Sequence, residues 1–131
     1  MSATENKATV IAAYEAFGRG DVVSVLAINA PNAVWINYST PASPLNGEHK
    51  GLEAVGEFFN LIGSSMEIEQ FDMTPIAADG DTVVATGNQR YRVRSTGKTV
   101  SGSVVHVFTF DADGKVVRFE EWESYVHDAW T

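Results

Sequence analysis

Hydrophobic and polar residues alternate along the second half of the chain, and this alternation predicts long β-strands. The segment VVHVFTFD, residues 104–111, puts His106 on the same face of its strand as Val104 and Phe108. A turn at Asp113-Gly114 follows, and a second strand, KVVRFEEWESY, begins after it. The two strands are therefore expected to pair as a hairpin.

The second strand of this hairpin also carries ionisable side chains on an apolar face. The residues expected on that face are Val117, Phe119, Glu121 and Glu123. A histidine and carboxylates among apolar neighbours on paired strands are typical of a pocket inside a curved sheet. A buried histidine beside a carboxylate is also a candidate acid/base pair.

The first half of the chain has helical spacing. Ser2 and Glu5 form a capping-box pattern before a helix that ends near the glycines at 18 and 20. Asp21 is expected to cap a second, short helix. The second and third helices are predicted over residues 22–28 and 52–62, a loop over 39–50, and strands over 33–38, 66–77, 82–95, 99–110 and 115–125.

Helices followed by a run of strands joined by hairpin turns predict an α+β fold in one domain, residues 1–131. The strands are long for a domain of this size, and a long sheet that twists will curl. We therefore expect a cone-shaped, curved antiparallel sheet wrapped around the N-terminal helices, which is an α+β barrel with an internal pocket.

Composition narrows the functional classes. The chain has 17 acidic and 9 basic residues and a net charge of −8, which disfavours nucleic acid and anionic membrane surfaces as partners. It has no cysteine, so disulfides and thiolate chemistry are excluded. An apolar stretch of about 18 residues is absent, and so is a signal-peptide pattern, so a cytoplasmic location is expected. No glycine-rich dinucleotide or phosphate loop occurs, and we expect no cofactor.

The order helix–helix–strand–helix–four strands resembles the nuclear transport factor two-like superfamily. That superfamily includes ketosteroid isomerase, limonene-epoxide hydrolase and the SnoaL-like polyketide cyclases, and the likeness is nearest to the SnoaL-like proteins. The segments that carry it are Gly20-Asp21, NAVWIN at 32–37, GEHKGLEAVGEFF at 47–59 and HVFTFDADGKVVRFEE at 106–121. The resemblance implies the cone-shaped fold, but one such fold hosts isomerases, cyclases, hydrolases and non-catalytic binders.

The resemblance to ketosteroid isomerase places Asn37 where that enzyme has its general base, an aspartate. An amide cannot take a proton at neutral pH. The isomerase's protonated aspartic acid corresponds to His106, and its oxyanion tyrosine corresponds to Ala13. Isomerisation by that route is therefore not expected.

The resemblance to limonene-epoxide hydrolase matches the tyrosine and asparagine that hold its attacking water to Trp35 and Asn37. Its arginine and one aspartate fall on Gly87 and Gln89, and its second aspartate falls on Glu121. The water-activating set is therefore incomplete, and epoxide hydrolysis is not expected either.

His106 and Glu121 are the candidate catalytic residues, with Glu121 orienting the imidazole across the hairpin. The alternatives are a neutral His106 that only satisfies hydrogen bonds in a polar pocket, and a Glu121 that pairs with an arginine or reaches solvent beside Glu120 and Glu123. The candidate substrate-binding residues are Tyr14, Trp35, Asn37, Gln89, Phe108, Phe119 and Glu123. Trp35 and Tyr14 have a plain core role as their alternative.

Two further histidines are less central. His49 lies in the proline-rich loop, where a solvated side chain is the simpler interpretation, and His127 lies in the terminal segment. The histidines show no HxH or HxxxH spacing, so no metal site is expected.

The opposite face of the sheet predicts an interface. Arg90, Arg92 and Arg94 alternate on the face away from Gln89. The same face should carry Val105, Val107, Arg118, Glu120 and Trp122, a mixture of apolar and charged groups that is typical of a contact surface. The resemblance implies a homodimer through this face, and the alternative is that the arginines only protect an exposed sheet.

These observations lead to two functional hypotheses. The first is a protein that binds a small apolar molecule bearing carbonyl or hydroxyl groups. If it is an enzyme, it acts on that molecule by proton transfer, as in isomerisation, cyclisation, dehydration or hydration, with Asn37 and Gln89 fixing the substrate. The second is a non-catalytic ligand-binding or protein-interaction module of the same fold.

Overall fold

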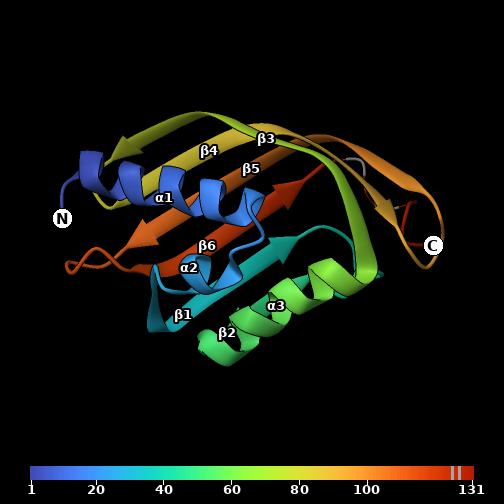
Figure 1. The fold of residues 1–131 in the computed structure, drawn as a ribbon, viewed down its shortest axis with the longest axis horizontal. Helices are drawn as coiled ribbons and strands as arrows, with labels where there is room; N and C mark the ends of the chain where they lie inside the picture. Colours follow the sequence, from blue (N-terminus) through green and yellow to red (C-terminus); the bar gives the residue numbers. More distant parts are fainter. Residues whose placement is uncertain (125, 127) are drawn as a thin grey trace.

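The computed structural model describes residues 1–124, 126 and 128–131, and it has the α+β fold expected from the sequence (Figure 1). Helices dominate the first half and strands the second. The elements are α1 (Ala3–Gly18), α2 (Val22–Leu26), β1 (Asn29–Tyr38), β2 (Gly47–Lys50), α3 (Gly51–Ser65), β3 (Met66–Asp79), β4 (Thr82–Val93), β5 (Thr99–Phe110) and β6 (Val116–Glu123).

The strands form one curved six-stranded sheet in the order β2-β1-β6-β5-β4-β3. The antiparallel meander from β3 to β6 is confirmed, but β1 runs parallel to β6, so the sheet is mixed rather than wholly antiparallel. The reason is the path of the chain, which leaves β1, passes through β2 and α3 and re-enters the sheet at its far edge. The sheet is also not closed into a barrel, because β2 and β3 remain edge strands.

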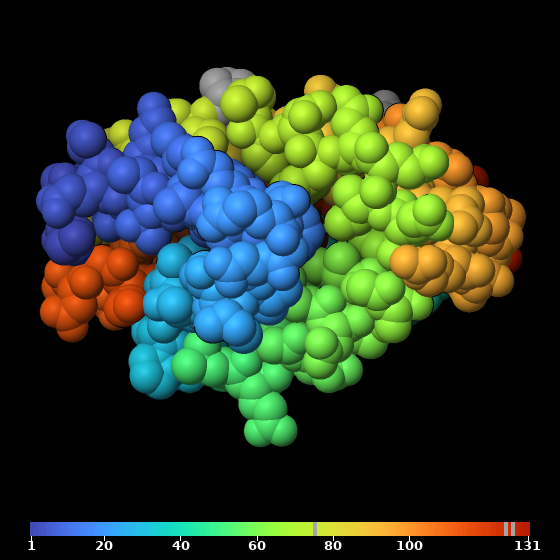
Figure 2. Space-filling view, viewed as in Figure 1, coloured from blue at the N-terminus to red at the C-terminus, as the bar shows by residue number. Residues whose placement is uncertain are grey.

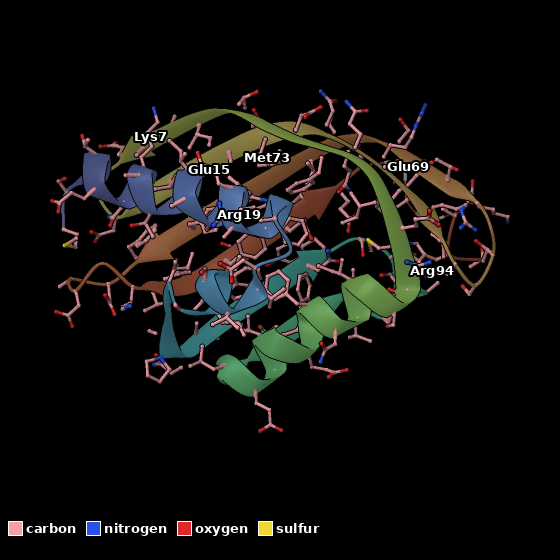
Figure 3. All side chains as sticks on the ribbon, in the orientation of Figure 1. Lys7, Glu15, Arg19, Glu69, Met73 and Arg94 are labelled. Atoms are coloured by element: carbon pink, nitrogen blue, oxygen red, sulfur yellow. The ribbon has the colours of Figure 1, made fainter. Side chains whose placement is uncertain are left out.

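The three helices lie on the concave side of the sheet (Figure 1). α1 packs against β3 and β4, whereas α3 packs against β1 and β2, and together with α2 they cover much of the face seen in Figure 2. Charged side chains such as Glu15, Arg19, Glu69 and Arg94 lie on the outside, while apolar side chains fill the space between helices and sheet (Figure 3). None of the described helices is long and apolar enough to cross a membrane.

The predicted helix starts are confirmed. Ser2 and Glu5 form a reciprocal capping box, with the Ser2 hydroxyl 3.1 Å from the Glu5 amide and the Glu5 carboxylate 3.2 Å from the Ser2 amide. Asp21 caps α2 by accepting a hydrogen bond from the Ser24 amide. α2 ends at Leu26, two residues earlier than expected.

Other predictions about local structure were wrong. The segment predicted as a loop over residues 39–50 ends in the short strand β2, which pairs antiparallel with β1 from Asn37 opposite Gly47 to Val34 opposite Lys50. β2 has only four residues and no apolar alternation, so its sequence gave no strand signal. The strand predicted over residues 82–95 ends at Val93, and Tyr125, predicted as the last strand residue, lies outside the described residues.

A further wrong prediction concerns Val117. The register between β5 and β6 shifts between Thr109 and Phe110, so Val116 rather than Val117 is the fully buried residue at the start of β6. Beyond this bulge, Phe119 is buried and pairs with Phe108 as expected.

Candidate active site

A cavity lies between the concave face of the sheet and the helices. The cavity has a volume of about 80 Å³, taken as the space open to the centres of water molecules. This is room for several waters or the body of a small molecule. Its walls are mainly apolar and include Phe17, Trp35, Phe58, Phe71, Phe108 and Phe119. Its polar lining includes Tyr14, Gln89, Tyr91, His106, Glu121 and Glu123.

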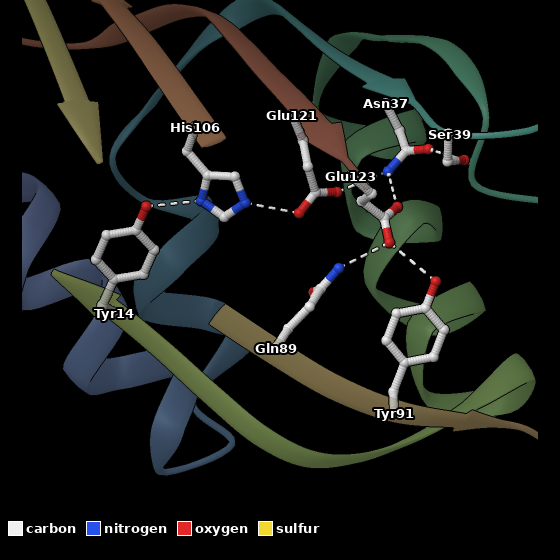
Figure 4. A network of polar contacts seen from close by, with 8 residues as sticks. All are labelled: Tyr14, Asn37, Ser39, Gln89, Tyr91, His106, Glu121 and Glu123. Carbon is white, nitrogen blue, oxygen red and sulfur yellow. Dashed lines mark hydrogen bonds and ion pairs between the residues drawn. The ribbon is translucent and has the colours of Figure 1, made fainter. Parts of the chain in front are cut away.

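His106 is held between a phenol and a carboxylate (Figure 4). Nδ1 of the imidazole lies 2.7 Å from the hydroxyl of Tyr14 on α1, and Nε2 lies 2.6 Å from Oε2 of Glu121. His106 and Glu121 are direct partners in the β5–β6 register, so the predicted contact between them is confirmed. Both side chains are almost entirely removed from solvent.

The partners of His106 fit one neutral tautomer of its imidazole. Burial, together with the nearby charge of Glu121, raises the pKa of Tyr14 well above its usual range, so the phenol keeps its proton. In the neutral Nε2–H tautomer of His106, the Tyr14 hydroxyl donates to Nδ1 and Nε2–H donates to the Glu121 carboxylate. A carboxylate that orients an imidazole in this way is a recurrent element of acid/base sites.

A second carboxyl group, that of Glu123, lies in the same polar end of the cavity (Figure 4). Its Oε1 accepts hydrogen bonds from Gln89 Nε2 and the Tyr91 hydroxyl, each at 2.9 Å, and its Oε2 accepts one from Asn37 Nδ2 at 2.9 Å. Burial and the charge of Glu121 raise the pKa of Glu123 to about 7, although the three hydrogen bonds oppose this change. The Glu123 carboxyl therefore changes between its protonated and its ionised form near neutral pH.

Comparison with known proteins identifies the family. The family model of the SnoaL-like domain matches residues 10–119, most of the chain. The chain belongs to the SnoaL-like family. No curated protein matches it.

Solved structures agree with this SnoaL-like assignment. A nuclear transport factor two-like protein from Burkholderia xenovorans LB400 is 30% identical, with 92% of this chain and 90% of that one covered and a TM-score of 0.81. A polyketide cyclase candidate from Xanthomonas campestris pv. campestris is 21% identical over 93% and 92% of the two chains, with a TM-score of 0.77. TerC, co-crystallised with polyporic acid, is 24% identical over 88% of each chain, with a TM-score of 0.71. The last two comparisons show the shared fold.

In this SnoaL-like protein, Asn37 does not line the cavity, contrary to the substrate-fixing role expected from the sequence. It is fully buried behind the two carboxylates, and its amide nitrogen donates to Glu121 Oε1 at 2.6 Å and to Glu123 Oε2 at 2.9 Å. Its amide oxygen accepts from the Ser39 hydroxyl at 2.5 Å. Because these contacts occupy its side chain, Asn37 links the two carboxylates instead of facing a ligand.

Trp35 lines the cavity only through its ring. The indole nitrogen donates to Asn29 Oδ1 at 2.7 Å, so the hydrogen-bond donor that the sequence offered to a ligand is already used. The ring packs on Phe119 with centroids 4.1 Å apart. The apolar wall includes Trp35, Phe108 and Phe119, and the polar end includes Tyr14, Gln89 and Glu123. All six line the cavity, as the sequence predicted.

Sequence reasoning missed Tyr91. It lies two residues after Gln89 on the same face of β4, and its hydroxyl contacts Glu123 while Trp130 Nε1 lies 3.4 Å from that hydroxyl. The i, i+2 relation to Gln89 was the signal that would have found it. Trp130 has no such signal, because it follows the last strand.

The remaining histidines lie outside the cavity lining or outside the described residues. His49 is in β2 rather than in a solvated loop, and its Nε2 donates to the Leu45 carbonyl oxygen at 2.7 Å while its ring packs on Phe58. His127 falls outside the described part of the chain. Across residues 1–124, 126 and 128–131, no group of three histidine or acidic side chains is placed to hold a metal ion.

Proposed function

We propose that this SnoaL-like protein binds a small apolar molecule bearing a carbonyl or hydroxyl group and moves protons to and from it. The apolar walls suit the body of such a molecule, and the polar end suits its oxygen. A fold neighbour, TerC, was co-crystallised with polyporic acid, which supports a small-molecule site in this fold.

The observation that carries the proposal is the pairing of two buried acid/base systems at one end of an apolar cavity. The Tyr14–His106–Glu121 chain and the Glu123 carboxyl both line it. Buried titratable groups with a specific charge partner are enriched at catalytic sites. Isomerisation, cyclisation, dehydration and hydration are the reaction classes that such groups serve without a covalent intermediate.

One observation favours the second candidate, a non-catalytic binding protein. Both nitrogens of His106 are engaged, and Asn37 is committed to the two glutamates and Ser39. A network that satisfies itself in this way also serves to keep buried polar groups from destabilising the fold.

The two candidates differ in whether a bound carbon acid exchanges its protons. β-Tetralone, an apolar ketone with acidic protons beside its carbonyl, is a suitable probe. We expect it to change the tryptophan fluorescence of the protein, to which Trp35 in the cavity wall contributes, in a saturable way. We also expect the protein to speed the deuterium exchange of the ketone in deuterium oxide, followed by NMR. Saturable binding without faster exchange would favour the binding protein, and absence of both would reject the proposal for this ligand class.

A further inference from the structure

His106 is poorly placed to take a proton directly from a ligand, although it is the residue that sequence reasoning favoured. Its two ring nitrogens already contact Tyr14 at 2.7 Å and Glu121 at 2.6 Å. An imidazole has only these two sites for hydrogen bonds. A ligand would have to break one of these short contacts before His106 could exchange a proton with it.

Glu123 keeps one site open. A carboxylate offers about four lone-pair positions, two on each oxygen. Oε1 accepts from Gln89 and Tyr91, and Oε2 accepts from Asn37 alone among the residues that the structure describes. One position on Oε2 therefore has no partner among residues 1–124, 126 and 128–131, and Glu123 lines the cavity.

We propose that Glu123 is the residue that exchanges the proton with the bound molecule, and that Tyr14, His106 and Glu121 act as positioning residues. This inference rests on the function proposed above. His106 contacts one oxygen of the Glu121 carboxylate, and Asn37 donates to the other and to Glu123, so it joins the two carboxylates. The negative charge beside Glu123 then favours its protonated state.

The surroundings of Glu123 suit a general acid/base. The titratable groups that face its end of the cavity are Glu121 on its own strand, Tyr91 on β4, His106 on β5 and Tyr14 on α1. Burial and the Glu121 charge together bring the pKa of Glu123 to about 7, and the proton-transfer efficiency of a general base is highest when its pKa is near the operating pH.

The proposed step balances without a further reactant. The Glu123 carboxylate takes a proton from the carbon beside a carbonyl group, so a C–H bond breaks and an O–H bond forms on Oε2. The C–H electron pair becomes the C=C bond of an enolate, and the carbonyl π pair moves onto its oxygen. Gln89 lines the cavity and uses one hydrogen of Nε2 on Glu123, so its other N–H is the available donor to that oxygen. Return of the proton to carbon completes the reaction.

The test compares β-tetralone deuterium exchange in the wild type, Glu123→Gln and Glu120→Gln. Glu120 is the neighbouring carboxylate on β6, and it contacts Tyr38 and Arg118 on the opposite face. We expect Glu123→Gln to slow exchange by about 100-fold or more while keeping ligand-induced fluorescence change, and Glu120→Gln to leave exchange unchanged.

Exchange that survives Glu123→Gln within a few-fold would overturn the role of Glu123 and leave the proposed function standing. Absence of exchange in the wild type would instead reject the proposed function, and the role of Glu123 with it.

A second variant covers the case in which Glu123→Gln does not fold. The wild-type exchange rate should rise with pH through about 7 as Glu123 ionises. Tyr91→Phe removes a hydrogen bond that lowers the pKa of Glu123, so it should move the midpoint of this profile upward. A profile whose midpoint is the same in wild type and Tyr91→Phe would overturn the proposal.

Discussion

Tyr14 on α1 and His106 on β5 are 92 positions apart in the sequence, and their side chains meet with the phenol oxygen 2.7 Å from Nδ1. Their rings are also stacked, with centroids 5.8 Å apart. This contact ties the first helix to the middle of the sheet and occupies one of the two nitrogens of the His106 imidazole. The fold and the chemistry of the site therefore depend on the same hydrogen bond.

Replacing Tyr14 by phenylalanine should destabilise the protein by about 1–3 kcal/mol, because it leaves the buried Nδ1 of His106 without its hydrogen-bond partner. Urea unfolding measures this loss. Tyr38→Phe is the matched control, since the Tyr38 hydroxyl donates to Glu120 at an exposed position. The control should cost less than about 0.5 kcal/mol. Equal losses in the two variants would show that the Tyr14 hydroxyl has no special role.

The Glu123 carboxyl predicts an unusual pH dependence of stability. Its folded-state pKa, about 7, is raised above the ordinary value of 4.5, so the native state binds more protons than the unfolded state between these values. The free energy of unfolding should therefore fall as pH rises from 4.5 through 7, by up to a few kcal/mol.

Glu123→Gln should remove this fall, because the amide does not titrate. Urea unfolding of both proteins across this pH range measures the difference, and the variant should gain relative to the wild type at the alkaline end. Parallel curves for the two proteins would mean that Glu123 ionises with an ordinary pKa. Glu120→Gln should leave the slope of the wild-type curve in place.

Gly87 allows the backbone of β3 to come unusually close to its antiparallel neighbour β4. A Cβ at this position would lie 1.8 Å from the Asp72 carbonyl oxygen, a backbone atom that cannot move away without shifting β3. Gly87→Ala should therefore destabilise the protein strongly, by about 3 kcal/mol or more. Gly63→Ala on α3 is the control, because nothing lies within 4 Å of its Cβ and alanine favours a helix. Thermal unfolding should separate the two, and a mild effect of Gly87→Ala would show that the strands relax.

The elements predicted correctly are those with local signals. The Asp113-Gly114 turn and the alternation on both sides of it define the β5–β6 hairpin, and this local register brings His106 opposite Glu121. The capping pattern at Ser2 likewise depends on residues three apart. The parallel pairing of β1 with β6 and the strand β2 carry no such local signal, because they arise from where distant segments meet.

In the candidate site, too, the positions with a local signal could be predicted, and the contacts between distant segments could not. Gln89 and Glu123 are on cavity-facing positions that alternation indicates, but the hydrogen bond between them depends on how β4 and β6 curve around β5. The position of Asn37 behind both carboxylates depends on the β1–β6 pairing. Its sequence position indicated the correct face and not its partners.

The convex face of the sheet predicts a homodimer. Tyr38 and Trp122 stack there with centroids 4.9 Å apart, and each remains 40% exposed. Val105 pairs with Trp122 in the register, and the Arg118–Glu120 ion pair lies beside this aromatic pair. An exposed aromatic pair with charges around it has the composition of an interface.

We expect sedimentation analysis to give a dimer, and Trp122→Glu to shift it to the monomer by burying a charge. Val23→Glu is the control, since Val23 is 78% exposed on α2, away from that face. A monomeric wild type would reject the interface, and equal dissociation by Val23→Glu would place it on the helices instead.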